Sequence, residues 1–221
     1  MKTIYSLLLI ILLSLALISC AQNKPTKKEA TSKKEKVDLT NYSKAVFASG
    51  CFWCVESVFE SVKGVQEVIS GYAGGDESNP TYEQVGSGQT GHAEAIEVYY
   101  DSTVVSYTSL LKVYFNSQDV TQVNGQGPDR GSQYRSIILF NNEIEKDLAE
   151  KYIAEINESK KYSSPVAATV EKLTKFYPAE DYHQDYVINN PGNPYVQGES
   201  IPRIKRAQKL FKELLKPEKV L

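Results

Sequence analysis

The sequence has few residues of the kinds that bind metals or react as nucleophiles, and it has no strong excess of either charge. Its 221 residues include three cysteines and two histidines, and the net charge is -2 at pH 7. This charge gives no reason to expect a nucleic acid or an acidic substrate. No internal repeat is evident, so a repeat architecture is not indicated. The hydrophobic content of 41% and charged content of 24% are those of an ordinary globular protein, and the length suits one domain with appendages.

The chain begins with a segment typical of a secretory signal peptide. Lys2 precedes an apolar run, residues 4–19, which Leu17-Ile18-Ser19-Cys20 closes. This ending resembles a bacterial lipobox, which implies that residues 1–20 are a signal peptide and that Cys20 is lipidated. We therefore expect a membrane-anchored lipoprotein outside the cytoplasm, facing the periplasm. The alternative is an uncleaved transmembrane anchor, but the run is short for a span of about 20 residues.

Residues 21–43 are rich in lysine and have almost no apolar side chains before Val37. Such a segment buries too little apolar surface to offset the entropy of ordering it. We interpret it as a flexible tether. A basic strip that lies on anionic lipid headgroups is the alternative.

Hydrophobic periodicity divides the rest of the chain into strands and helices. Strands are predicted at 44–49, 65–72, 94–100, 134–140 and 166–173. Helices are predicted at 52–62, 107–116 and 142–159, with short ones around 181–189 and 201–215. Two long polar loops lie at 71–91, with one helical turn at 82–85, and at 117–131.

The order of the predicted core elements is strand, helix, strand, strand, helix, strand. This is the ferredoxin-like βαββαβ arrangement, here with an extra helix and strand, and it predicts a two-layer α/β (α+β) sandwich. We expect a catalytic domain at 44–200 and a C-terminal helix or tail at 201–221. The pattern leaves open whether the chain beyond Pro191 packs on the domain.

Cys51 and Cys54 form a C-x-x-C pair at the end of the first strand. Backbone N–H groups and the helix dipole favour a thiolate at the start of the helix, so Cys51 is expected to have a lowered pKa. Cys54 lies one helical turn away on the same face, and a disulfide between the two is geometrically reasonable. The motif by itself fits a redox pair or half of a zinc site.

Glu94 shares one face of the third strand with Ile96 and Val98. If those residues face the core, Glu94 does too, and burial would raise its pKa so that it holds a proton near neutral pH. The alternative is that Glu94 lies just outside the strand and faces water.

Six blocks of the sequence resemble peptide methionine sulfoxide reductase of the A type. They occur in that family's order over about residues 44–190. The blocks are Gly50-Cys51-Phe52-Trp53, Gly71-Tyr72-Ala73-Gly74-Gly75, Pro80-Thr81-Tyr82-Glu83, Gly91-His92-Ala93-Glu94, the run from Gly127 to Ser136, and Ala179-Glu180-Asp181-Tyr182-His183-Gln184. The family fold is the ferredoxin-like sandwich, in which the first strand lies between the third and fourth and runs antiparallel to both.

The resemblance implies a role for each matched residue. Cys51 would attack the sulfoxide sulfur, and Glu94 would donate a proton to the sulfoxide oxygen, assisted by Tyr82 and Tyr134. Phe52 and Trp53 would hold the substrate methyl group. Asp129 would order the site through its loop. His183 would line the same pocket, with a packing histidine as the alternative.

The sequence departs from the commoner family pattern in its cysteines. Many members have glycine at the position of Cys54 and carry resolving cysteines near the C-terminus, whereas this chain has no cysteine after Cys54. Cys54 is therefore the only intramolecular candidate for the resolving role. The resemblance implies reduction of free and peptide-bound methionine (S)-sulfoxide, in protein repair, by a monomer without metal or other cofactor. The Cys51–Cys54 disulfide would pass to thioredoxin or a thioredoxin-like dithiol protein.

Two other functions remain as alternatives. A thioredoxin-like disulfide oxidoreductase would use the same motif, but it leaves Glu94 and the Gly127–Ser136 block unexplained. A zinc-binding module would use Cys51, Cys54, His92 and His183, which are the only such ligands available once Cys20 is lipidated.

Overall fold

The computed structural model describes residues 38–221. The predicted signal peptide, the lipidation site at Cys20 and most of the predicted tether lie outside the described residues. Within the part that is described, no helix has both the length and the apolar character needed to cross a membrane.

A central sheet organises the described residues, and its strand order within 38–221 is β7-β6-β1-β3-β2-β8. Its strands are β1 Ser43–Ser49, β2 Val65–Ala73, β3 Ala93–Tyr100, β6 Ser136–Phe140, β7 Thr169–Lys172 and β8 Tyr177–Pro178. Strand β1 pairs antiparallel with both β3 and β6, while β7 joins β6 in parallel. The predicted ferredoxin-like core, with its added helix and strand, is confirmed.

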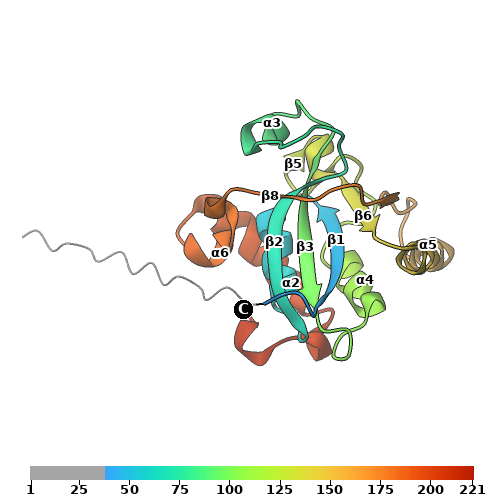
Figure 1. The fold of residues 1–221 in the computed structure, drawn as a ribbon. Helices are drawn as coiled ribbons and strands as arrows, with labels where there is room; N and C mark the ends of the chain where they lie inside the picture. Colours follow the sequence, from blue (N-terminus) through green and yellow to red (C-terminus); the bar gives the residue numbers. More distant parts are fainter. Residues whose placement is uncertain (1–37) are drawn as a thin grey trace, which may run out of the picture. The chain divides into compact units, whose positions relative to one another are not determined.

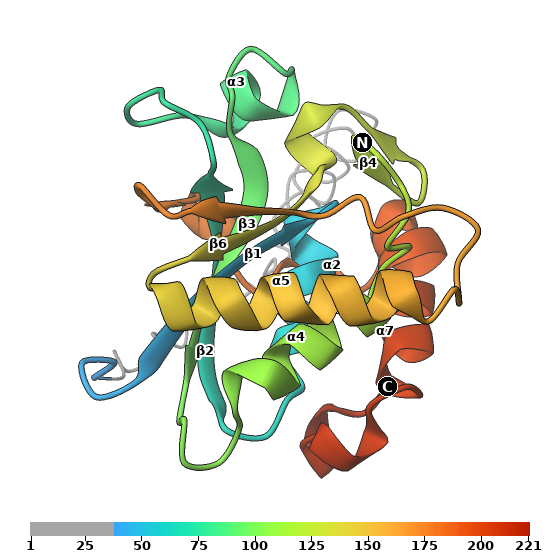
Figure 2. The same cartoon turned by 90° about the vertical axis from the view of Figure 1, so that its right-hand side faces the viewer.

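Helices cover one face of this sheet (Figure 1). The main ones are α2 Phe52–Glu60, α4 Tyr107–Asn116 and α5 Glu143–Glu158. Figure 2 shows α5 lying alongside β6 and α4. The larger core cluster lies under α2 and α4 and includes Phe47, Ile96 and Val98, each 0% exposed. Burial of these side chains is the main force that holds α2 on the sheet.

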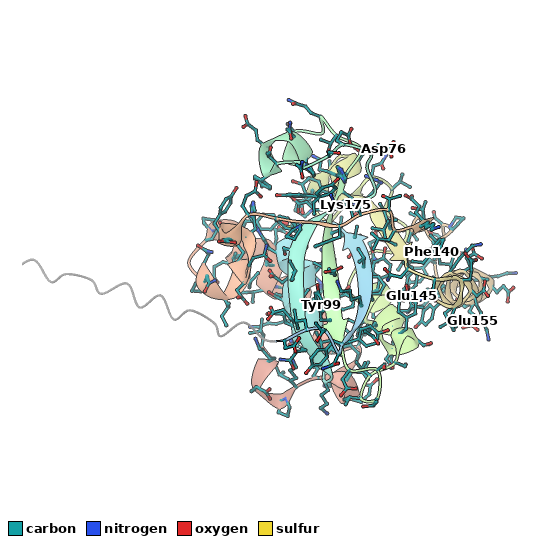
Figure 3. The ribbon with its side chains drawn as sticks, in the orientation of Figure 1. Asp76, Tyr99, Phe140, Glu145, Glu155 and Lys175 are labelled. Carbon is teal, nitrogen blue, oxygen red and sulfur yellow. The ribbon has the colours of Figure 1, made fainter. Side chains whose placement is uncertain are left out.

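The opposite face of the sheet is covered by a non-helical segment of the chain. The segment between β7 and β8 crosses this face, and Figure 3 labels Lys175 on it. Leu173 and Phe176 of this segment pack on a second, smaller cluster that includes Ala95 and Ile137. Small residues on this face let the crossing segment approach the strands closely.

The loops contain short elements that the hydrophobic pattern only partly revealed. The predicted helical turn at 82–85 is α3, Tyr82–Gly86, which starts with a capping box between Thr81 and Gln84. The remaining short elements are β4 Gly125–Gln126, β5 Asp129–Arg130, η1 Ser132–Tyr134, η2 Asp181–His183, α6 Tyr186–Asn189, η3 Val196–Ser200, α7 Ile201–Gln208, η4 Lys212–Leu214 and η5 Pro217–Lys219. The fourth strand starts at Ser136 rather than at 134 because a 3₁₀ turn precedes it.

The chain beyond Pro191 packs on the domain. Helix α7 buries Ile204 and Ala207 and contacts α2, and Phe211 is 0% exposed. Leu215 forms a β-bridge with Val62, so the chain end is tied to the end of α2. Helix α7, Phe211 and Leu215 are therefore part of the core that supports the C-x-x-C helix.

Candidate active site

Five of the predicted site residues come from elements at one end of the sheet. Strand β1 ends there, β3 begins there, and α3 and β5 lie at the same end (Figure 1). Cys51 follows β1, and Tyr82, Glu94 and Asp129 belong to α3, β3 and β5, while Tyr134 ends the short η1 turn that follows β5. Antiparallel pairing of β1 with β3 produces this arrangement, because the end of one strand then lies beside the start of the other.

Gly50 makes the sharp turn from β1 into α2. Its φ is +75°, a conformation that favours glycine, and an added Cβ would lie 2.4 Å from Cβ of Gln126. Cys51 then occupies the N-cap position, where its carbonyl accepts the backbone N–H groups of Cys54 and Val55. The turn therefore places the Cys51 side chain, only 6% exposed, at the start of the helix.

Glu94 is the buried acid of the site. It is 2% exposed, so the alternative that it faces water is wrong. Its Oε2 accepts the Phe52 backbone N–H at 3.0 Å, which fixes the carboxyl next to the residue after Cys51. Burial raises the pKa of Glu94 to about 8, although the Phe52 hydrogen bond opposes the shift. The side chain is therefore a proton donor at neutral pH.

The expectation that the helix start lowers the pKa of Cys51 is wrong. Burial raises the pKa of this thiol, and its hydrogen bond with Cys54 and the charge of Glu94 act in the same direction. The single N-terminal turn of α2 does not compensate for the loss of solvent. These surroundings therefore favour the neutral form of Cys51.

The surroundings of Cys54 favour its charged form. Its hydrogen bond with Cys51, the positive charge of Arg203 and the hydroxyl of Ser200 lower its pKa to about 6, against the effect of burial. Cys54 Sγ lies 3.2 Å from Ser200 Oγ, and Cys54 is 1% exposed. No disulfide joins the two cysteines in this structure.

Aromatic rings form a wall beside the cysteines. Tyr186 stacks on Trp53 with ring centroids 3.7 Å apart and planes 7° apart. The Phe52 ring lies 5.0 Å from the His183 ring, and the Tyr82 ring lies 4.3 Å from it, between centroids. This arrangement brings the predicted apolar residues Phe52 and Trp53 together in one wall.

His183 both packs in the wall and forms a directed hydrogen bond. Trp53 Nε1–H donates to His183 Nδ1 at 3.0 Å, which leaves the ring proton on Nε2. Burial lowers the pKa of His183, so the ring is neutral near pH 7. The packing and pocket-lining interpretations of this residue are therefore compatible.

Tyr82 and Tyr134 both interact electrostatically with Glu94 and Cys51. Burial raises the pKa of Tyr82 to about 12, and the charges of Glu94 and Cys51 add to the shift. The pKa of Tyr134 is also raised, by burial and then by Glu94. Both hydroxyls therefore stay protonated and can donate hydrogen bonds.

Asp129 is held by a tyrosine that sequence reasoning missed. The Tyr195 hydroxyl donates a hydrogen bond to Asp129 Oδ2 at 2.6 Å. Burial raises the pKa of Tyr195, and the charges of Cys51 and Cys54 raise it further. Tyr195 follows the matched blocks, so no motif pointed to it. Ser200 and Arg203 were missed for the same reason.

Glu180 fixes the loop that carries His183. Its carboxylate accepts the Tyr72 hydroxyl at 2.7 Å and the Tyr82 backbone N–H at 3.0 Å. Burial opposes its charge, but these hydrogen bonds lower the pKa of Glu180. Glu180 belongs to one of the blocks that resemble the family, so the sequence contained a signal from which its place in the site could have been predicted.

The zinc-binding alternative does not fit the geometry. His92 accepts the Gly75 N–H at Nδ1, and its Nε2 lies 2.8 Å from the Glu77 carbonyl oxygen. Both ring nitrogens are thus occupied by the backbone. Across residues 38–221, no three His, Cys, Asp or Glu side chains lie close enough together to hold a metal ion.

A buried thiol pair beside a protonated carboxyl and two protonated tyrosines defines a thiol-dependent oxidoreductase that can also deliver a proton. The sequence profile of the family described as peptide methionine sulfoxide reductase matches residues 43–215. The chain belongs to the peptide methionine sulfoxide reductase family, whose members are oxidoreductases.

Individual relatives agree with this assignment. The chain is 49% identical to peptide methionine sulfoxide reductase MsrA of Nautilia profundicola over 77% of its length and 96% of that protein. It is 47% identical to MsrA of Natronomonas pharaonis over 76% of its length and 95% of that protein.

Solved structures with the same fold include two from this family. The reduced form of Mxr1 from Saccharomyces cerevisiae superposes with a TM-score of 0.62 at 31% identity, over 73% of this chain and 92% of that one. Methionine sulfoxide reductase A of Corynebacterium diphtheriae gives 0.63 at 30% identity, over 70% of this chain and 77% of that one.

Proposed function

We propose that this protein reduces methionine (S)-sulfoxide, free or in peptides, and completes its thiol cycle with Cys51 and Cys54 alone. The observation that carries this proposal is the hydrogen bond of 3.0 Å between the Phe52 N–H and Glu94 Oε2. This hydrogen bond holds the buried, protonated carboxyl group of Glu94 beside Phe52, the residue next to Cys51. Disulfide exchange develops negative charge only on sulfur, whereas sulfoxide reduction requires a proton at the oxygen that leaves the substrate.

In the first step the Cys51 sulfur attacks the sulfoxide sulfur. Its proton passes to the Cys54 thiolate, and Glu94 gives its proton to the sulfoxide oxygen. A bond thus forms between the two sulfurs, and the oxygen then moves from the substrate sulfur to Cys51 Sγ. The new Cys51 S–O bond forms as the sulfur–sulfur bond and the substrate S–O bond break, so methionine leaves and Cys51 becomes a sulfenic acid. The sulfoxide is reduced by two electrons and Cys51 is oxidised by two. Tyr82 and Tyr134 donate hydrogen bonds to the oxygen as its charge develops.

In the second step the Cys54 sulfur attacks the sulfenic sulfur of Cys51. The S–S bond forms, the S–O bond of Cys51 breaks, and the leaving hydroxide takes the Cys54 proton and becomes water. Glu94 regains its proton from solvent. A thioredoxin-like dithiol donor then reduces the Cys51–Cys54 disulfide and supplies two electrons and two protons.

A cleft supports access of an external donor to Cys54. Its volume is about 420 Å³, and Cys54, Asp129, Tyr195 and Arg203 are among its lining residues. Because Cys54 lines this cleft, we expect the donor to approach the disulfide from this side.

The purified protein is expected to convert the S epimer of a methionine sulfoxide peptide to methionine with dithiothreitol as reductant, and to leave the R epimer unchanged. Chromatography of the peptide products measures both. Cys51→Ser, which removes the attacking thiol, should show no conversion. Absence of turnover on the S epimer would refute the proposed reaction.

We also propose that the protein is a lipoprotein anchored outside the cytoplasm, because Leu17-Ile18-Ser19-Cys20 resembles a lipobox. Mass spectrometry of protein extracted from membranes is expected to find Cys20 at the N-terminus with lipid attached. Cys20→Ser should yield a chain without lipid. An intact, unlipidated Met1 terminus on the wild-type protein would contradict the anchor.

A further inference from the structure

The C-terminal segment places a buried hydroxyl against the second cysteine. A π-helical turn, η3 Val196–Ser200, runs directly into α7. Such turns are rare in proteins, and those that occur are often found at functional sites. Ser200 is 0% exposed, and its Oγ lies 3.2 Å from Cys54 Sγ. The turn therefore directs Ser200 at the sulfur of Cys54.

Arg203 lies one turn further along the same face. Ser200, Arg203, Ile204 and Ala207 have the spacing of one helix face, and the last two are buried in the core that α7 shares with α2. Packing of Ile204 and Ala207 thus fixes the distance of Ser200 and Arg203 from the C-x-x-C helix.

The guanidinium of Arg203 is held by neutral groups. Its Nε donates to the Ser117 carbonyl at 2.8 Å, and its Nη2 donates to the Ser49 carbonyl at 2.8 Å and to Ser49 Oγ at 3.3 Å. These bonds orient the guanidinium toward the end of β1, where the cysteine pair begins. The charge of Arg203 also acts on Asp129, whose pKa it lowers against the effect of burial.

Several ionisable groups surround Cys54. Arg203 favours its charge, Asp129 opposes it, and Cys51 donates a hydrogen bond to it. Glu94 and Tyr195 interact with it as well, since its charge raises the pKa of each. Arg203 is the only cation among these groups, so it is the one whose removal should change the charge state of Cys54.

We propose that Ser200 and Arg203 are positioning residues that hold the Cys54 sulfur in its charged form and orient it toward Cys51. The C-terminal segment of this chain, which has no cysteine of its own, would thereby serve the resolving step through Cys54. This inference rests on the proposed function. Arg203 acts when Cys54 loses its proton to the leaving hydroxide and attacks the Cys51 sulfenic acid.

The test uses the full chain in detergent, mixed with one equivalent of free methionine (S)-sulfoxide over a range of pH. Quenched samples report methionine release. The fluorescence of Trp53, the only tryptophan, and mass spectrometry report disulfide formation. In Arg203→Gln, disulfide formation at pH 7 is expected to be about tenfold slower and to recover when the pH is raised by about 1–2 units.

Three other variants control the result. Arg203→Lys keeps the charge and should restore most of the rate. Lys205→Gln removes a positive charge from an exposed position on the same helix that does not line the cleft, and it should behave as wild type. Ser200→Ala removes only the hydroxyl contact and should slow disulfide formation less than Arg203→Gln. Circular dichroism verifies that each variant is folded.

A second readout does not depend on sulfoxide chemistry. In Cys51→Ser, the rate of Cys54 alkylation by iodoacetamide is followed against pH by mass spectrometry. Adding Arg203→Gln is expected to move the midpoint upward by about 1 pH unit or more.

The outcomes separate the two proposals. An unchanged pH profile in both assays, or a loss of rate that is equal at every pH, would overturn the role of Arg203. A wild-type protein that releases methionine but forms no Cys51–Cys54 disulfide would instead overturn the proposed function, while the alkylation midpoint would still report on Arg203.

Discussion

Glu94→Gln is expected to slow methionine release in a single turnover by about 10²–10⁴-fold, the usual contribution of a general acid. Glutamine has nearly the same shape and can still accept the Phe52 N–H through its amide oxygen. The site geometry should therefore survive while the proton is lost. The measurement is a rapid-quench assay of methionine release from the reduced enzyme.

The pH dependence of the same step provides a second check on Glu94. A carboxyl with a raised pKa is protonated below that pKa and loses its proton as the pH rises through it. Burial raises the pKa of Glu94 to about 8, so wild-type release should decline as the pH rises above this value. Glu94→Gln should lack this decline, because its side chain does not titrate.

Glu97→Gln is the matched control. Glu97 lies on the same strand, but its side chain is 13% exposed and pairs with Lys44 at 3.4 Å. This substitution should leave methionine release close to the wild-type rate. A normal single-turnover rate in Glu94→Gln would show that the proton comes from another group, with Tyr82 and Tyr134 as the nearest donors.

Cys54→Ser is expected to release about one methionine per enzyme and then stall when a thioredoxin-type protein is the only reductant. Without the second sulfur no disulfide forms, and a dithiol donor has no substrate. The amplitude of methionine release is the quantity to measure, together with trapping of the Cys51 sulfenic acid by dimedone.

Dithiothreitol provides the control for this variant. A small thiol can reduce the sulfenic acid directly, so turnover should resume when it is added. Serine is close in size to cysteine, so the buried site around Ser200 should not collapse. Multiple turnover by Cys54→Ser with the protein donor, at the wild-type rate, would show that Cys54 is not the resolving residue.

The position of Glu94 illustrates what a local pattern can predict. Its place in the alternation of β3 allowed either a buried or a water-facing side chain. The structure buries it because Ile96 and Val98, on the same face, pack under α2. The pattern predicted the face, but only the helix above that face decided the burial and hence the raised pKa.

The cysteine pair shows where local reasoning fails. A helix start favours a thiolate, and this argument assigned the lower pKa to Cys51. The structure reverses the order, since Cys51 is buried beside Glu94, whereas Cys54 lies beside Ser200 and Arg203. The charge state of Cys54 depends on groups about 150 residues away in the chain, which no spacing rule relates to the motif.

The sequence by itself determined the order of the core elements, the C-x-x-C pair, the family motifs and the absence of any cysteine after Cys54. These features are local, because strand alternation, helical spacing and motif residues are all read within a few positions. Only the tertiary structure decided that the chain beyond Pro191 packs on α2, and that Tyr195 and Arg203 reach the site. Burial and charge are set by neighbours in space, and these neighbours meet only when the chain folds.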